Sequence, residues 1–399
     1  MMRQQTDILI SGGGIAGLTA AAAFGMAGFS VICVDPEPPV TSEEAAGSDL
    51  RSTAFLQPSI EVLRAAGLWD RLLPFAAPLQ IMRIIDAGGV QPEPRIIKEF
   101  NAAEISDQPF GWNLPNWLLR REIAARLAEL PNVSFRPGMA TTGLLTREAQ
   151  ALVTLSDGTM VEAKLVIACD GRNSTMRQAL DIPVKTLRYG QKALAFAVNH
   201  PIPHGNVSTE IHRSGGPFTL VPLPDRNGQP ASAVVWMETG PEVARLAALP
   251  PEDFAQALNT RSCGILGELT LISRLTAWPI IAQVASRMSG ERTALLAEAA
   301  HVLPPIGAQG LNMSLADLAC LLDLATAKPH ELGSAQMLES YHRKRHNDVQ
   351  LRVTGIDALN RASMVGAQGL RDLRAGMLDT LYSIAPLRRT MMRAGLGLR

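Results

Sequence analysis

The chain has 399 residues, with 37 Lys and Arg against 37 Asp and Glu, and its formal net charge is zero. Hydrophobic residues make up 47% and charged residues 19%, so most of the chain can bury itself and bulk disorder is excluded. The length fits two or three modules, or one large α/β body with an inserted domain. A general nucleic-acid binder is disfavoured, because it would need a basic surplus.

The four cysteines, Cys33, Cys169, Cys263 and Cys320, are far apart and have no CxxC spacing. We therefore expect small buried thiols in a reducing cytoplasm, with no disulfide framework and no metal site. The N-terminus is polar and leads directly into an apolar strand, so no signal peptide is expected. No stretch of 18 residues is apolar without interruption, and no membrane span is expected.

The first 35 residues predict a β-α-β unit. Residues 7–11 form a buried strand, residues 15–27 an alanine-rich helix, and residues 30–34 a second apolar strand. The turn between the first strand and the helix carries the glycines of the pattern GxGxxG. Such a turn cradles the pyrophosphate of a dinucleotide.

Each glycine of this turn has a physical role. Gly12 permits the tight turn, Gly14 lets the backbone approach a pyrophosphate closely, and Gly17 lets the helix pack on the strand. Backbone N–H groups of the first helical turn, which holds Ile15 and Ala16, attract the anion. The alternative is a glycine-rich turn in an unrelated α/β fold.

Asp35 ends the second strand, 23 residues after Gly12. An acidic side chain at this place can bind a ribose hydroxyl pair. The alternative is a simple turn residue before Pro36.

Later segments predict more strands and then helices. Residues 151–155 and 160–162 flank a hairpin turn, and residues 165–168 read as a further apolar strand. Residues 181–285, rich in Pro, Thr and Val, predict a mixed or antiparallel sheet, and the chain is helical from about residue 334.

Two later segments indicate which dinucleotide binds. Residues 169–174 read Cys-Asp-Gly-Arg-Asn-Ser, and residues 297–301 read Ala-Glu-Ala-Ala-His, followed by Pro305, the segment 307–312 and Asp317. Together they resemble the "DG" and "GDAAH…P…GQG.N…D" segments of the group A flavoprotein monooxygenases. The segment 49–52, Asp-Leu-Arg-Ser, is a further match.

The resemblance implies an α/β fold: a Rossmann-like, GR2-type FAD-binding domain with an inserted mixed β-sheet substrate domain and a helical C-terminus. It implies FAD contacts in addition to those of the first glycine turn. These are Arg51, Asn116, Asp170, Glu298, Gly307, Gly310, Leu311 and Asn312. Pro305, Gly307 and Gln309 would lie near the flavin ring, where a helix N-terminus stabilises negative charge.

Some of these residues also have ordinary structural interpretations. Asn116 is equally interpreted as the N-cap of a helix over residues 118–130. Arg120 reads as an exposed helix arginine, with a phosphate contact as the alternative, and His301 as a hydrogen-bonded structural histidine.

The domain limits that follow divide the chain discontinuously. The FAD-binding domain takes 1–75, 109–180 and 286–330, the substrate-binding domain 76–108 and 181–285, and the C-terminal helical region 331–399.

Further matches resemble the ubiquinone-biosynthesis branch, the 2-polyprenylphenol ring hydroxylases. They are Tyr189-Gly-Gln191, Gly216-Pro217-Phe218, Val221-Pro222, Trp236, Tyr341-His-Arg343 and Asp348. The branch implies an FAD-dependent, NAD(P)H-consuming monooxygenase that hydroxylates an aromatic ring with O2 through a C4a-hydroperoxyflavin. No catalytic triad and no metal are implied. Alternatives are a hydroxylase or epoxidase of the same fold acting on another aromatic substrate, and a weakly flavin-binding scaffold subunit of a quinone-biosynthesis complex.

The sequence departs from the family pattern at two places. Ala297-Glu298 replaces Gly-Asp, and residues 307–310 read Gly-Ala-Gln-Gly where relatives often read Ala-Gly-Gln-Gly. Ala308 would cost stability on the order of 1 kcal/mol if its position needs a positive φ.

The C-terminal segment 365–399 is basic, with six arginines and two aspartates, and apolar residues interleave with them. A basic amphipathic helix of this kind lies on an anionic membrane or docks a partner. The alternative, a helix that packs on its own domain, is favoured. The expected location is the cytoplasm, with peripheral contact to the inner membrane and association with other quinone-biosynthesis proteins as further hypotheses.

Overall fold

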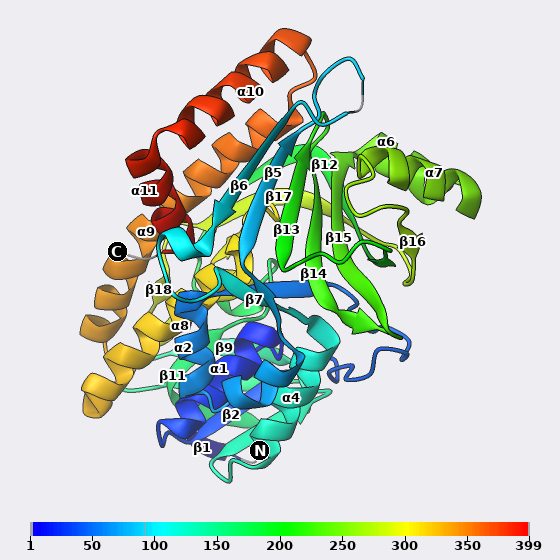
Figure 1. The fold of residues 1–399 in the computed structure, drawn as a ribbon. Helices are drawn as coiled ribbons and strands as arrows, with labels where there is room; N and C mark the ends of the chain where they lie inside the picture. Colours follow the sequence, from blue (N-terminus) through cyan, green and yellow to red (C-terminus); the bar gives the residue numbers. More distant parts are fainter. Residues whose placement is uncertain (1–2, 92, 398–399) are drawn as a thin grey trace.

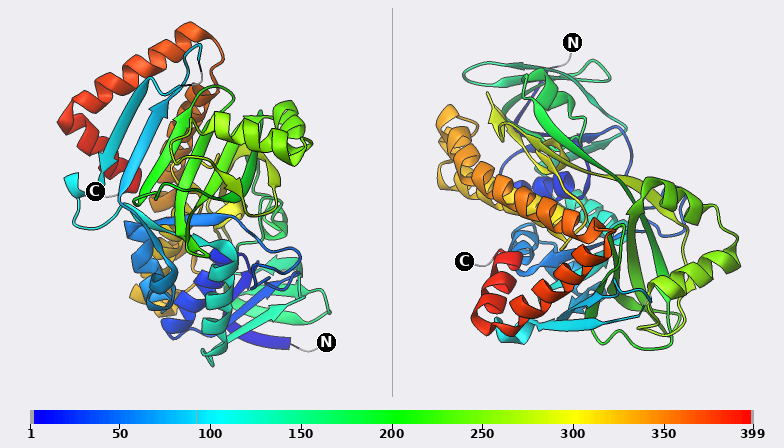
Figure 2. Two further views of the ribbon diagram at one scale, coloured as in Figure 1. Left: turned by 45° about the vertical axis from the view of Figure 1, so that its right-hand side comes forward. Right: turned by 90° about the horizontal axis from the view of Figure 1, so that it is seen from above.

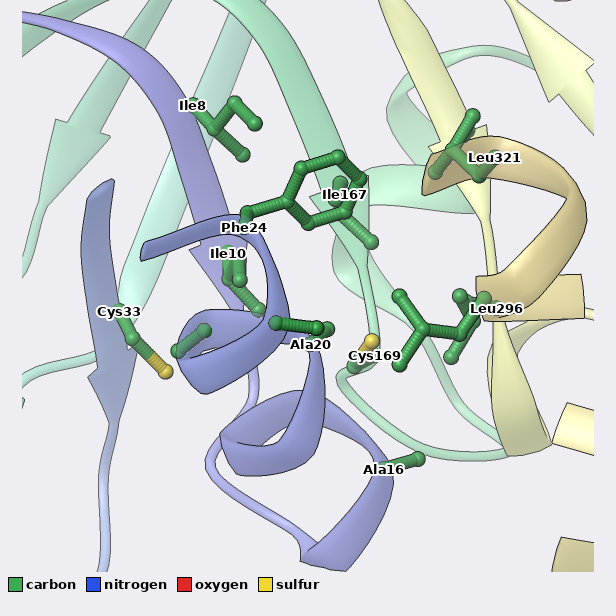
Figure 3. Packing of buried hydrophobic residues seen from close by; sticks show 14 of the residues in the cluster. Ile8, Ile10, Ala16, Ala20, Phe24, Cys33, Ile167, Cys169, Leu296 and Leu321 are labelled. Atoms are coloured by element: carbon green, nitrogen blue, oxygen red, sulfur yellow. The ribbon is translucent and has the colours of Figure 1, made fainter. Parts of the chain in front are cut away.

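The β-α-β unit is present in the computed structural model, which describes residues 3–91 and 93–397 (Figure 1). Strand β1 (Arg3–Ser11) pairs in parallel with β2 (Val31–Asp35), and helix α1 (Ile15–Met26) connects them. The helix is buried over nearly its whole length, because its small alanines let it pack closely against the sheet. Figure 3 shows Phe24 of α1 beside Ile10 and Ile167 of the sheet.

The sheet around β1 forms the first layer. Its strands, in spatial order, are β18 (Ser289–Gly290), β19 (Thr293–Leu295), β11 (Met160–Ala168), β1, β2 and β8 (Val133–Pro137). The antiparallel strands β9 (Thr141–Thr146) and β10 (Ala151–Leu155) extend it from β11. The predicted hairpin is confirmed, but residues 165–168 are not a separate strand. They continue β11, because Glu162 and Ala163 pair with both β1 and β10 and the strand runs on without a break.

A second, mixed sheet forms the upper layer (Figure 1). Eight of its strands, in spatial order, are β20 (His301–Val302), β17 (Thr276–Ala285), β12 (Val184–Asn199), β15 (Gln229–Thr239), β14 (Pro217–Arg226), β13 (Val207–His212), β5 (Ile81–Asp86) and β6 (Ile96–Asn101). The short strand β16 (Thr270–Leu271) pairs with β12 outside this order. Within this sheet β13 and β5 pair in parallel and the other neighbours antiparallel. Helices α6 (Gly240–Ala247) and α7 (Pro251–Arg261) pack on one face through an apolar cluster.

Smaller elements join the two layers. They are a sheet of β3 (Ser52–Leu56), β7 (Gly111–Pro115) and β4 (Ala77–Leu79), and the helices α2 (Gln57–Ala65), α3 (Trp69–Leu72), α4 (Asn116–Ala128) and α5 (Thr175–Ala179). Helix α4 begins two residues before the predicted helix, so Asn116 lies in its first turn and Pro115 is the N-cap.

The C-terminal region is helical, as predicted. It contains α8 (Gln309–Ala327), α9 (Ala335–Met364), α10 (Gln368–Ser383) and α11 (Ala385–Leu396). Among the described helices, α8 is the one whose length and apolar composition would suffice to cross a membrane. Its Asp317 is fully buried in an ion pair with Arg345, and its apolar residues belong to the protein core.

Helices α10 and α11 lie along β5 and β6 (Figures 1 and 2). Charged pairs fasten them there: Arg95–Asp372, Lys98–Asp379, Arg374–Asp86 and Arg388–Glu104. The ring of Tyr382 meets Phe100 edge to face, with the centroids 5.4 Å apart. Most of the basic segment thus packs on its own chain; Arg399 lies outside the described residues.

The backbone is strained at two alanines. Ala297 has φ 57° and Ala308 has φ 56°, in the left-handed region that favours glycine. Ala308 therefore has the positive φ at which an alanine lowers the stability of the protein. Ala297 begins a short 3-10 helix (Ala297–Ala299), Ala308 is the N-cap of α8, and both line the large cavity described below.

We predict that Ala308→Gly stabilises the protein by up to about 1 kcal/mol, because release of the left-handed strain exceeds the added entropy of the unfolded chain. Urea denaturation measures this change. Ala125→Gly, at an exposed position inside α4, is the matched control and should destabilise by about 1 kcal/mol. Destabilisation of similar size by both substitutions would contradict the strain argument.

Candidate functional site

A cavity of about 1620 Å³ lies between the two layers. It exceeds the range of about 300–1,000 Å³ that is usual for a single small ligand. Its lining includes most residues of three separated stretches that the sequence singled out: residues 12–17, 170–172 and 297–311. The fold therefore brings these stretches together around one space.

The first glycine turn leaves room at a helix N-terminus. A Cβ on Gly12, whose φ is 106°, would lie 2.3 Å from the carbonyl oxygen of Cys169, and a Cβ on Gly17 would lie 2.0 Å from the carbonyl oxygen of Gly12. Around Gly14, in contrast, no atom lies within 4 Å of such a Cβ. Gly14 is the N-cap of α1 and offers no side chain to the first N–H groups. The open space beside these donors fits a pyrophosphate.

Asp35 lies at the end of β2 and lines the cavity. Its Oδ2 accepts the N–H of Gly13 at 2.5 Å, and its Oδ1 accepts the N–H of Glu37 at 2.8 Å. These bonds hold the carboxylate still. Each oxygen keeps acceptor capacity for a ribose hydroxyl.

Arg51 and Asn116 meet at a common carboxylate. Arg51 donates to both oxygens of Asp49 at 2.7 Å, and Asn116 Nδ2 donates to Asp49 Oδ2 at 2.9 Å. Burial opposes ionisation of Asp49, but these donors hold its pKa below the usual value. The Asn116 side chain also accepts from Thr53 Oγ1 at 2.7 Å. It is fixed by Thr53 and Asp49 and does not act as an N-cap.

Arg120 differs from the favoured sequence interpretation. It is not an exposed helix arginine but half-buried, and it lines the cavity. Its Nε is buried and has no hydrogen-bond partner among the described residues. A buried donor without a partner is costly, and the side chain that carries it borders the cavity, where its positive charge attracts an anion.

The second stretch follows β11. Asp170 accepts the Ser174 hydroxyl at 2.5 Å and the N–H of Met176 at 3.1 Å, so it fastens the start of α5 while it lines the cavity. In the third stretch, Glu298 lies 3.8 Å from Arg172, and both side chains are about half exposed. Such a loose pair leaves Glu298 available to a ligand.

The third stretch continues into the start of α8. Pro305, Gly307, Gln309, Gly310 and Leu311 line the cavity. No side chain caps the first turn of α8, so its N–H groups are available at the cavity wall.

Asn312, in contrast, is not among the lining residues. Its side chain accepts from the Leu56 N–H and the Ser59 hydroxyl, and it donates to the carbonyls of Ala54 and Ala308. It lies behind the loop and holds it against β3 and α2, so we interpret it as a positioning residue.

A polar network, which the sequence did not reveal, supports this loop from behind. Buried His301 pairs with Asp317 at 2.6 Å, and Asp317 accepts from Arg345 at 2.6 Å. Arg345 also pairs with Asp348 at 2.9 Å. His301 is thus a hydrogen-bonded structural histidine, as interpreted from the sequence.

The network reaches the last helix through Arg352. This residue donates to Asp348 at 3.2 Å and to Gln309 Oε1 at 3.0 Å. Gln309 Nε2 in turn donates to the carbonyl of Gly395 in α11 at 3.0 Å. The spacing of Asp348 and Arg352, four residues apart on one helix, was a visible signal for an ion pair, but the contact with Gln309 is long-range.

The rest of the cavity is mostly apolar. Helices α9, α10 and α11 contribute Ile356, Leu359, Leu370, Leu373, Met377, Leu378, Leu381, Met391, Met392 and Leu396. On α10, Leu370, Leu373 and Met377 are each more than half exposed, so the apolar wall continues to the protein surface. We call this part of the cavity the apolar channel.

Comparisons with known proteins agree with this geometry. The family model described as "FAD binding domain" matches residues 5–355. The chain is 32% identical to the ubiquinone hydroxylase UbiL of Rhodospirillum rubrum, over 98% of this chain and 89% of that protein. It is 24% identical to the 3-demethoxyubiquinol 3-hydroxylase of Escherichia coli over the full length of both.

Among solved structures, p-nitrophenol 4-monooxygenase of Pseudomonas putida DLL-E4 has the same fold, with a TM-score of 0.81 at 20% identity over the full length of both chains. The family match covers most of the chain and includes the three stretches that line the cavity. The chain therefore belongs to the FAD-binding domain family, in the group of FAD-dependent aromatic hydroxylases that includes the ubiquinone hydroxylases.

Proposed function

We propose that this protein hydroxylates the aromatic ring of a polyprenyl-phenol intermediate of ubiquinone biosynthesis, with O2 and NAD(P)H as co-substrates. One observation carries the proposal: a single cavity joins the cofactor loops to the apolar channel under α9, α10 and α11. The cofactor loops suit FAD, and the channel suits a prenyl tail. The relatives in Rhodospirillum rubrum and Escherichia coli are named for ubiquinone chemistry, which supports this substrate class.

Different residues around the cavity bind different parts of FAD. The open space at Gly14 receives the pyrophosphate, and Asp35 receives the adenosine ribose. Arg120 offers its positive charge to a phosphate, and Asp170 and Glu298 serve the ribityl chain or the pyrophosphate. When bound, FAD supplies the redox chemistry that activates oxygen.

The start of α8 supports the reaction electrostatically. Its uncapped N–H groups, beginning at Gln309, stabilise negative charge at the adjacent cavity wall. Pro305 and Gly307 form the loop before this helix and allow close approach of a flat ring. The surrounding apolar side chains exclude water from the reacting atoms.

We propose that NAD(P)H docks transiently at the cavity mouth, because the sequence carries one GxGxxG turn and this turn is assigned to FAD.

The surface beside the apolar channel supports a second part of the proposal, which concerns the membrane. Exposed Met377 and Met391 lie on α10 and α11, and Arg389 is 57% exposed. This combination favours peripheral contact with an anionic inner membrane, where prenylated phenols reside, and association with other quinone-biosynthesis proteins there.

One observation favours a second candidate, a weakly flavin-binding scaffold subunit. Ala297 and Ala308 both have positive φ and line the cavity, and their methyl groups restrict how closely a cofactor approaches. Turnover by the isolated protein discriminates between the two candidates.

We predict that purified protein with FAD oxidises NAD(P)H and hydroxylates a 2-polyprenylphenol, with product identified by mass spectrometry. Leu378→Trp, which places a bulky ring in the apolar channel, should raise KM for a long-chain substrate at least tenfold. KM for a phenol with one prenyl unit should change less than twofold, and this shorter substrate is the control for folding. A colourless protein without NAD(P)H oxidation would contradict the proposal and favour the scaffold candidate.

We predict that Gly14→Ala raises the Kd for FAD at least tenfold, about 1.4 kcal/mol, because its methyl group enters the space that the pyrophosphate needs. Gly14 has φ −66°, which alanine adopts freely, so thermal stability without FAD should not change. Gly369→Ala is the matched control, since a Cβ there also meets no atom within 4 Å and the residue does not line the cavity. Equal FAD affinity of wild type and Gly14→Ala would contradict this placement.

A further inference from the structure

Strand β13 carries a polar row on an otherwise apolar wall of the cavity. Its side chains alternate between the two faces of the sheet. Ile211 faces α6 and α7 and belongs to their apolar cluster, whereas Ser208, Glu210 and His212 line the cavity. The neighbouring strands present mainly apolar side chains to the same space: Met82 and Ile84 of β5, Val221 of β14 and Val235 of β15.

Glu210 is the most notable member of this row, because its side chain is only 10% exposed. Its Oε1 lies 2.7 Å from His212 Nε2. Nδ1 of His212 is buried without a partner among the described residues. The contact of Nε2 with Oε1 holds the carboxylate of Glu210 beside the imidazole ring and so limits its orientation.

In the described part of the chain, the second oxygen of Glu210, Oε2, has no charged partner, and it is not among the fully buried atoms that lack a hydrogen bond, so it borders the cavity that Glu210 lines. A carboxylate that is nine-tenths buried requires further hydrogen bonds. The residue lines the cavity, so a donor on a bound ligand can supply one.

The other charged groups at this end of the cavity are already engaged. Arg374 donates to Asp86 Oδ2 from Nε at 3.0 Å and from Nη2 at 2.8 Å, and its remaining contacts are the carbonyls of Arg213 and Ala362. Burial opposes ionisation of Asp86, but Arg95 and Arg374 hold its pKa below the usual value. Among the described residues that line this end of the cavity, no cation is thus left to balance the charge of Glu210 against a ligand carboxylate.

Glu210 also lies within reach of a ring that occupies the cavity. Glu210 is the direct cross-strand partner of Thr219 on β14. Pro222 lies three residues further along β14, and its carbonyl accepts a hydrogen bond from Asn113 Nδ2 at 2.8 Å. Three residues span about 10 Å in a strand. Asn113 and Glu210 both line the cavity, and their separation along β14 is long enough for a substituted aromatic ring to lie between them.

We propose that Glu210 accepts the hydrogen bond of the substrate's phenolic hydroxyl and so determines specificity for an uncharged hydroxylated ring over a ring that bears a carboxylate. This inference rests on the proposed function for the identity of the ring. The charge-assisted O–H···O⁻ bond is short and strong. It pulls the shared proton away from the phenolic oxygen, and the ring carbons ortho and para to that oxygen become richer in electrons without any covalent bond being broken.

Discrimination follows from both attraction and repulsion. A hydroxyl satisfies the open oxygen of Glu210, whereas a carboxylate leaves it unsatisfied and adds a like charge beside it. His212 acts through Glu210 as a positioning residue.

The test measures binding of two probes of the same shape to the FAD-loaded protein, without NAD(P)H: 4-nitrophenol, at a pH at which it is protonated, and 4-nitrobenzoate. Wild type should bind 4-nitrophenol at least tenfold more tightly. Glu210→Gln should reduce this preference at least tenfold. Glu99→Gln is the matched control, because Glu99 pairs with Arg83 in the same sheet and neither residue lines the cavity; its preference should match wild type.

His212→Asn is a second variant, which releases Glu210 and should reduce the preference by a smaller factor even if Glu210→Gln does not fold. Equal preference in wild type, Glu210→Gln and His212→Asn, or no binding of 4-nitrophenol to wild type, would overturn the inference. Because the probes report binding alone, loss of the preference is distinguishable from failure of the proposed function. A protein that shows the preference but no hydroxylation contradicts the function and retains the role of Glu210.

Discussion

The close approach of two loops at the carboxyl edge of a parallel sheet is the constraint on which the rest of the site depends. Strands β1 and β11 run in register, and the N–H of Cys169 donates to the carbonyl of Ser11 at 2.7 Å. Gly12 packs so tightly on Cys169 that no side chain fits there. Because β19 continues the same edge, with the N–H of Leu296 bonded to Ala168 at 2.9 Å, the third stretch follows directly.

The apolar channel depends on a different balance. Helices α10 and α11 are held by ion pairs, in which Arg374 pairs with buried Asp86, Arg388 with Glu104 and Asp372 with Arg95, and they turn leucine and methionine side chains inward. These ion pairs fix the position of the helices, and the apolar inner face remains free to contact a ligand. Through Arg352 and Gln309 the last helix is also tied to the loop before α8, so the channel wall and the cofactor loops form one connected structure.

Local chemistry made much of this predictable from the sequence. The place of the glycine turn before a helix, the place of Asp35 at the end of a strand and the left-handed strain at Ala308 follow from backbone geometry within a few residues, and the structure has each of these features. Pairings across long sequence distances were not predictable. Asp86 and Arg374 are 288 residues apart, and nothing near either residue indicates its partner.

The same limit explains the interpretations that changed. Arg120 resembles any surface arginine until the cavity places it at a wall, and Asn312 resembles a cofactor contact until its bonds to Leu56 and Ser59 place it behind the loop. The sequence around Glu210 does not indicate a site residue, because its proposed role depends on one face of a sheet whose strands come from distant parts of the chain.

Amide hydrogen exchange with and without FAD tests the central claim most directly. If one FAD is held by three converging stretches, its addition should protect residues 12–17, 170–172 and 297–311 together, with one common FAD dependence. Protection of residues 12–17 alone, with residues 297–311 unchanged at saturating FAD, would contradict the account.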